Sequence, residues 1–127
     1  MSERLITTPV FVRLRQATAN SPAVLTELCR DYISEARSTV AQIRDALEHG
    51  DAAQLRERAH YLKGSSMMIG AQHLSQRCAA LEQMGRDSEL AAANAELERA
   101  ITALKAVENE LEQELGPAVL PGEGSAA

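Results

Sequence analysis

Apolar residues recur at three- and four-residue steps along most of this chain, a spacing that places them on one side of an α-helix. Residues that start or stop helices interrupt this pattern, because Pro suits the first turn and Gly accepts the left-handed conformation at the C-terminus. The interruptions are Ser21-Pro22, His49-Gly50-Asp51, Gly70, Gly85-Arg86-Asp87-Ser88 and Gly116-Pro117. They predict helices over about 22–48, 52–68, 71–85 and 89–115.

Four amphipathic helices with short connections predict an all-α fold, an antiparallel four-helix bundle over residues 21–115. Aromatic residues make up only 2% of the 127 residues, so aliphatic side chains must fill the core. The stripe expected to be buried on the second helix is Leu55, Ala59, Leu62, Ser66 and Ile69. The leucines of the last helix fit a core stripe or a coiled-coil seam. Cys29 and Cys78 follow the apolar pattern, which predicts buried, reduced thiols.

The two ends of the chain lie outside this pattern. In residues 1–20, Thr8-Pro9 can cap a helix, whereas Val10, Val12 and Leu14 alternate as in a strand. With no other strand to pair with, a short extra N-terminal helix is the favoured interpretation. Residues 116–127 contain Gly, Pro, Ser and Ala without a pattern, which predicts a disordered tail.

The composition of the chain excludes several classes of function. Thirteen Lys plus Arg against eighteen Asp plus Glu give a formal net charge of −5, which disfavours a nucleic-acid partner. No apolar run reaches the roughly 18–20 residues that cross a bilayer, and the first residues do not resemble a signal peptide. We therefore expect a cytoplasmic protein that binds no membrane. The three histidines and two cysteines lack metal-ligand spacing, so no metal site is predicted.

One histidine stands apart from the apolar stripes. At 100° per residue, His60 points about 130° away from the buried stripe of its helix and faces solvent. Gly64 follows one turn later, where glycine costs about 1 kcal/mol relative to alanine and would leave room for another molecule. The residues within about 60° of His60 are Ala53, Arg56, Glu57, Lys63, Gly64 and Met67. We predict that Ala53, Glu57, Gly64 and Met67 contact a partner, whereas Met68 fits core or surface equally well.

These neighbours suit a phosphorylated histidine. A neutral imidazole nitrogen is a nucleophile, and a phosphoryl group on His60 would bring roughly two negative charges beside Lys63 and Arg56. No general base, second carboxylate or metal cluster is predicted beside the histidine. The site therefore suits a phosphoryl acceptor whose chemistry a partner completes, with Mg²⁺ expected on that partner and no cofactor on this chain.

The stretch AHYLKGSSMMIGAQHLSQRCAALE, residues 59–82, resembles the signature of histidine-containing phosphotransfer (HPt) domains. The positions in register are His60, Leu62, Lys63, Gly64, Ser65, Gly70, Ala71, Leu74, Cys78, Leu81 and Glu82. The resemblance implies a four-helix bundle whose histidine takes a phosphoryl group from a receiver-domain aspartate and passes it to another. It also implies His60 as the phosphorylation site, Lys63 as electrostatic support and Gly64 as the clearance residue.

The sequence thus predicts a monomeric, stoichiometric phosphoryl carrier of a multistep His-Asp phosphorelay, with response-regulator receiver domains and a hybrid histidine kinase as partners. It is not expected to be an enzyme with kinase activity, since the chain has no glycine-rich ATP loop. The alternative is a non-phosphorylated helical adaptor or dimerisation bundle. The dimerising core of a sensor kinase fits less well, because Tyr61 replaces the usual acidic residue and no Pro follows until Pro117.

Overall fold

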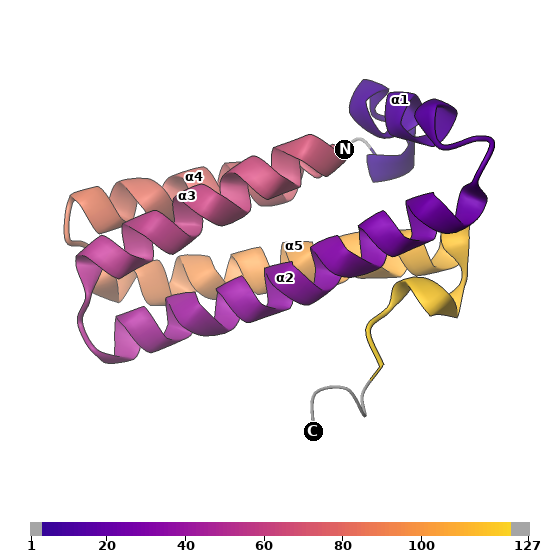
Figure 1. The fold of residues 1–127 in the computed structure, drawn as a ribbon. Helices are drawn as coiled ribbons and strands as arrows, with labels where there is room; N and C mark the ends of the chain where they lie inside the picture. The colour runs from indigo at the N-terminus through magenta and orange to yellow at the C-terminus, as the bar shows by residue number, and fades with distance from the viewer. Residues whose placement is uncertain (1–3, 123–127) are drawn as a thin grey trace.

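The computed structural model describes residues 4–122, and within them every regular element is helical. The principal helices are α1 (Pro9–Ala17), α2 (Pro22–Glu48), α3 (Ala52–Ile69), α4 (Gln72–Arg86) and α5 (Leu90–Leu115). Two short 3₁₀ turns, η1 (Leu5–Thr7) and η2 (Pro117–Val119), flank them. Short connections turn the chain back after α2, α3 and α4, so that the four long helices form an antiparallel bundle (Figure 1). The predicted fold class is confirmed.

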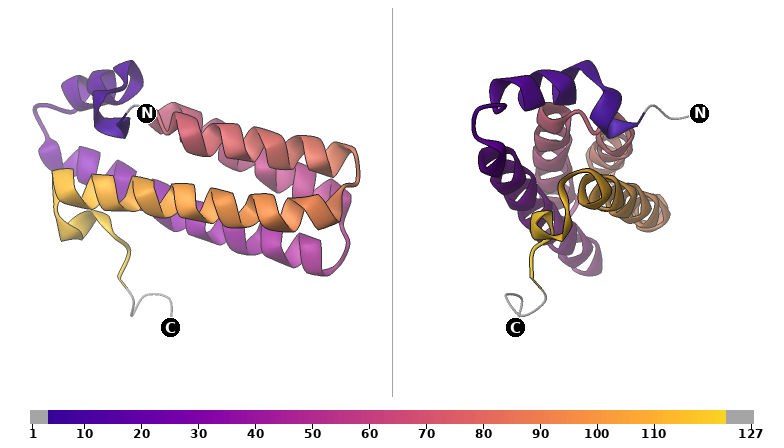
Figure 2. Two further views of the ribbon diagram at one scale, coloured as in Figure 1. Left: turned by 180° about the vertical axis from the view of Figure 1, so that it is seen from behind. Right: turned by 90° about the vertical axis from the view of Figure 1, so that its right-hand side faces the viewer.

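The bundle closes around aliphatic side chains. Seen end-on, α2, α3, α4 and α5 surround one core, and α1 crosses one end (Figure 2). The largest fully buried side chains of the four long helices are Ile33, Ile43, Leu55, Leu62, Leu74, Leu81, Leu97 and Leu111. The five-residue stripe predicted for α3 is buried throughout, which directs the opposite side of that helix to solvent. No helix within residues 4–122 is long and apolar enough to cross a bilayer.

The N-terminal segment is fastened to the end of the bundle. Thr8 caps α1, because its Oγ1 accepts a hydrogen bond from the Phe11 backbone N–H at 3.2 Å. Phe11 is fully buried, and the Ile6 N–H donates to Glu110 on α5 at 2.7 Å. Gly70, at a φ of 90°, ends α3 beneath this segment, where a Cβ would collide with Thr8 Oγ1. The segment therefore fixes the C-terminal end of α3.

The prediction of a disordered tail over 116–127 is wrong for residues 116–122. Residues 117–119 form a 3₁₀ turn that packs against α2 and α5, and the Val119 side chain is fully buried. Arg30 also donates a hydrogen bond to the Ala118 carbonyl at 3.2 Å. The burial of one valine side chain stabilises this segment, although its average composition is typical of a disordered tail. Residues 123–127 lie outside the described residues.

Gly85 acts as a packing residue in α4, although the sequence suggested that it ends the helix. The helix continues to Arg86. A Cβ at Gly85 would lie 2.9 Å from the backbone nitrogen of Arg56 and 3.0 Å from the Cα of that residue. The backbones of α3 and α4 therefore approach each other closely at this point, as only glycine permits. Gly64, in contrast, has nothing within 4 Å of the position a Cβ would take.

The two glycines should respond oppositely to the same substitution. Gly85→Ala should lower the free energy of unfolding by about 1–3 kcal/mol, because the added methyl group forces α3 and α4 apart. Gly64→Ala should raise it by about 0.4–1 kcal/mol, since alanine restricts the unfolded chain and meets no neighbour. Urea unfolding of both variants beside the parent measures these changes. A Gly85→Ala protein as stable as the parent would contradict the close approach.

Candidate functional site

The exposed face of α3 carries His60, whose side chain is 67% exposed. Ala53, Glu57, Gly64 and Met67 are exposed on the same helix, as their predicted role as partner contacts requires. Met68 is exposed as well, which decides its placement in favour of the surface. Whether these residues touch a partner stays a prediction.

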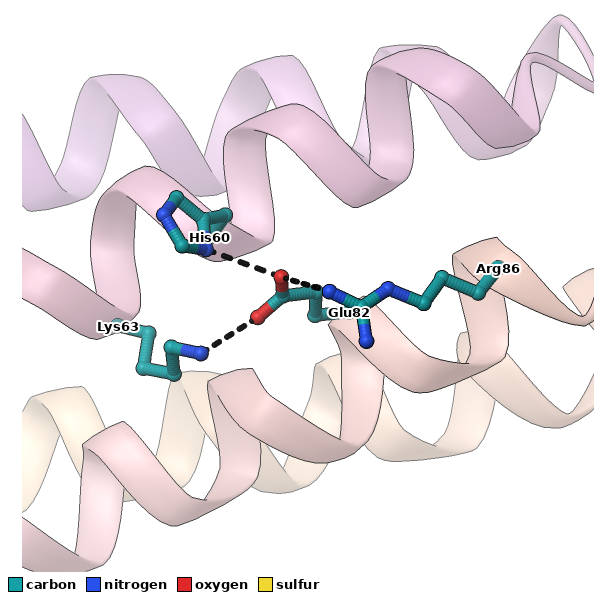
Figure 3. A network of polar contacts seen from close by, with 4 residues as sticks. All are labelled: His60, Lys63, Glu82 and Arg86. Atoms are coloured by element: carbon teal, nitrogen blue, oxygen red, sulfur yellow. Dashed lines mark hydrogen bonds and ion pairs between the residues drawn. The ribbon is translucent and has the colours of Figure 1, made fainter.

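A carboxylate from the neighbouring helix contacts His60. Glu82 on α4 places Oε2 2.9 Å from His60 Nδ1, although its own side chain is only 6% exposed (Figure 3). Lys63 Nζ donates to Glu82 Oε1 at 2.7 Å, and Arg86 donates to Oε2 at 3.1 Å. The prediction that no second carboxylate accompanies the histidine is therefore wrong. The helical spacing of 100° per residue relates only residues of α3, whereas Glu82 lies on α4, 22 residues further along the chain.

The charge on Glu82 is stabilised by these donors. The hydrogen bond from Lys63 is the largest effect that lowers the pKa of this carboxyl, and the hydrogen bond from His60 adds to it. Burial acts in the opposite direction, but the net result is a pKa below the usual 4.5. Glu82 is therefore ionised at neutral pH and acts only as a hydrogen-bond acceptor.

This arrangement selects one tautomer of the imidazole. Because Glu82 can only accept, His60 Nδ1 must donate its hydrogen to Oε2. In the neutral ring the lone pair then resides on Nε2, the nitrogen that makes no contact with the carboxylate. The exposed histidine thus presents a nucleophilic nitrogen to solvent while its other nitrogen is held in place.

The two predicted supporting cations occupy different positions. Lys63 lies beside His60 through their shared acceptor, Glu82. Arg56 is exposed on α3, but its side chain forms no ion pair within the described residues, and its backbone contacts Gly85. Arg86 on α4 is instead the second cation of the network. Its i,i+4 spacing from Glu82 is visible in the sequence, but relating that pair to His60 requires the packing of α3 on α4.

The fold and the site together define a class of protein. Its members are four-helix bundles with an exposed histidine on one helix, and here a carboxylate of the next helix contacts that histidine. Residues 27–115 match the sequence model of the Hpt domain. The chain belongs to the Hpt domain family.

Two known proteins resemble the chain. A crystal structure of histidine-containing phosphotransfer protein B (HptB) from Pseudomonas aeruginosa PAO1 superposes with a TM-score of 0.81 and 27% identity, over 90% of this chain and 96% of that one. Multistep phosphorelay regulator 1 of Schizosaccharomyces pombe is 33% identical over 55 residues, which are 43% of this chain. The matched region is 19% of that relative's length.

The lowered pKa of Glu82 predicts how stability depends on pH. A carboxyl whose pKa is lower in the folded state contributes stability above its unfolded value of 4.5, and this contribution is lost as the pH falls through the folded value. At neutral pH, Glu82→Gln should reduce the free energy of unfolding by about 1.5–3 kcal/mol, the range for hydrogen bonds to a charged group. Below pH 4.5 the difference from the parent should shrink.

Urea unfolding of parent and variant across this pH range provides the measurement. Glu27→Gln is the matched control, because Glu27 is exposed on α2 and takes no part in the hydrogen bonds of the Glu82 network. It should change stability by no more than about 0.5 kcal/mol at neutral pH. A constant difference between Glu82→Gln and the parent at every pH would show that the charge of Glu82 contributes nothing.

Proposed function

We propose that this protein is a phosphoryl carrier of a multistep His-Asp phosphorelay, and that Nε2 of His60 is the atom that carries the group. The observation that supports this most strongly is the hydrogen bond from His60 Nδ1 to the buried Glu82, which leaves Nε2 free on an exposed ring. Membership of the Hpt domain family supports the same function. The donor and the acceptor are aspartates of receiver domains.

The transfer requires no proton to leave the histidine. The Nε2 lone pair attacks phosphorus, the P–Nε2 bond forms, and the bond from phosphorus to the aspartyl oxygen breaks to release a carboxylate. Nδ1 keeps its hydrogen, so the ring becomes positively charged, and Glu82 lies at hydrogen-bond distance from that charge. In the reverse direction a charged ring is a better leaving group than a neutral one, so the same contact assists donation.

Charge and space around Nε2 suit this chemistry. Lys63 and Arg86 provide two cations beside one carboxylate, so one positive charge remains to balance part of the phosphoryl group. Both oxygens of Glu82 already accept hydrogen bonds, and we therefore assign the Mg²⁺ that assists the transfer to the receiver. Gly64 leaves open space one turn from His60, where a receiver must approach closely.

We further propose that the protein acts as a stoichiometric monomer in the cytoplasm without kinase activity, and that a hybrid histidine kinase supplies one of its receivers. Arg56 remains a supporting cation in this proposal, although Arg86 takes the nearer position. The alternative, an adaptor bundle that is never phosphorylated, predicts no transfer at all. Label transfer from a phosphorylated receiver therefore separates the two.

The first test substitutes the acceptor. His60→Gln should abolish transfer of labelled phosphoryl from a phosphorylated receiver, and it should lower the free energy of unfolding by only about 0.5–1.5 kcal/mol, the contribution of the hydrogen bond to Glu82. His73→Gln, an exposed histidine on α4, is the control and should accept label as the parent does. Label on the parent should be acid-labile and base-stable. If the His60→Gln protein still accepts label, another residue is the phosphorylation site.

The second test compares the two arginines. Arg86→Ala should shorten the lifetime of the phosphorylated form roughly 2–5-fold at low salt, the size expected of an exposed ion pair. Arg56→Ala should have a smaller effect, because Arg56 is not part of the Glu82 network. Both effects should diminish as salt screens the charges. Equal lifetimes for the Arg86→Ala protein and its parent would remove Arg86 from the site.

A further inference from the structure

A groove of about 290 Å³ lies between α4 and α5, two helices that run side by side in the bundle (Figure 2). The residues that line it are His73, Arg77, Arg99, Thr102, Ala103 and Ala106. At 100° per residue, His73 and Glu82 point about 180° apart on α4, and Glu82 faces α3. The groove is therefore on the other side of α4 from the His60 network.

The groove is positively charged, although the whole chain has a formal net charge of −5. Arg77 from α4 and Arg99 from α5 both line it. Glu82 is the only acidic residue of α4 and contacts α3, while Glu98 of α5 forms an ion pair with an arginine of α2 at 3.0 Å. Exposed carboxylates of both helices are thus engaged elsewhere, and an anion that enters the groove meets a local excess of cations.

One buried acid holds both arginines in place. Glu96 on α5 is 4% exposed, and it accepts hydrogen bonds from Arg77 Nη1 at 3.4 Å and from Arg99 Nη1 at 3.1 Å. One carboxylate balances one of the two cations, so the pair keeps one positive charge. Both arginine side chains are partly exposed, and each guanidinium has further N–H donors beside the one that Glu96 accepts. The groove therefore contains donors that are oriented before a ligand binds.

The groove continues into a second hollow of about 200 Å³ next to η1. The residues that line both spaces are His73, Ala103 and Ala106. Apolar side chains form much of the wall of the hollow, among them Leu5, Leu74 and Val107. Arg4 and Glu110 line it too, and their opposite charges leave the hollow without a net charge. The connected space is therefore cationic at the end formed by the two arginines and mainly apolar at the other.

We infer that this groove binds a small phosphate monoester, an activity separate from phosphoryl transfer. The phosphate group lies between Arg77 and Arg99, whose planar guanidinium groups donate to its oxygens, and His73 donates from its ring. The organic part passes over Ala106 into the apolar hollow. A phosphate group suits the site better than a carboxylate, because its two negative charges and three acceptor oxygens match donors that come from three side chains on two helices.

Titration of the full chain with inorganic phosphate and with phenyl phosphate tests the site. Both anions should shift the backbone amide signals of Arg77, Arg99 and Ala106 in heteronuclear NMR spectra. Phenyl phosphate should bind roughly tenfold more tightly, because the hollow removes its ring from water. Equal affinity for the two anions would show that the hollow takes no part, and the inference would be wrong. The absence of shifts at these residues with both anions would also overturn it.

Two variants test the charge of the groove. Arg99→Gln should weaken the binding of both anions roughly tenfold, the loss of one hydrogen bond to a charged group. Because this change also removes a partner of Glu96, Ala106→Glu is the second variant. Ala106 is exposed and lies outside the Glu96 network, so its replacement adds a negative charge to the groove and leaves those hydrogen bonds intact. Binding of both anions should again fall roughly tenfold at low salt.

Ala41→Glu is the matched control, because it makes the same change at an exposed position of α2 and should bind phenyl phosphate as the parent does. Unchanged binding by Ala106→Glu would contradict the inference.

His60→Gln separates this groove from the proposed phosphorylation site. The variant should bind phenyl phosphate as the parent does, and a loss of binding would place the anion beside Lys63 and Arg86 instead, which would overturn the inference. A single-stranded oligonucleotide that binds the groove more tightly than phenyl phosphate would identify nucleic acid as the ligand and would also overturn it. If phenyl phosphate binds as expected but no receiver labels the parent, the proposed function fails and this inference stands.

Discussion

The close approach of α3 and α4 determines the rest of the site. With only hydrogen at Gly85, the backbone at Arg56 comes within contact distance, and α4 lies near enough for Glu82 to reach His60 across the gap. A bulkier residue at position 85 would displace the helix that carries both Glu82 and Arg86. The contact between His60 and Glu82 thus depends on a glycine that has no functional group of its own, because its missing side chain sets the distance between the two backbones.

Glu82 connects stability and chemistry through one carboxylate. Burying an ionised group is unfavourable unless hydrogen bonds replace water, and here Lys63, Arg86 and His60 provide them. The same bonds orient the imidazole and gather two cations beside it. The buried carboxylate therefore holds the side chains of the site together, while the imidazole of His60 remains exposed to solvent.

The sequence predicted what is local. Periodicity located four helices, the buried stripe of α3 and the outward direction of His60, because each of these depends on neighbours within one helix. Contacts between residues of different helices could not be predicted in this way. Glu82 and Arg86 belong to α4, and their place beside His60 follows from packing that no single helical wheel contains. The prediction for the tail was wrong for a related reason, since Val119 is buried where η2 packs against α2 and α5, two helices that meet only in the folded bundle.

The two consecutive methionines on α3 have a consequence for how many partners one surface can serve. Met67 is 58% exposed and Met68 80%, on the helix that carries the histidine. Thioether side chains are unbranched and polarisable, so they reshape themselves to differently contoured surfaces at little energetic cost. A relay carrier must engage one receiver to load and a different one to unload. Flexible methionine side chains around an imidazole that Glu82 orients meet both requirements, because the surrounding contacts can adapt while the orientation of the His60 ring stays the same.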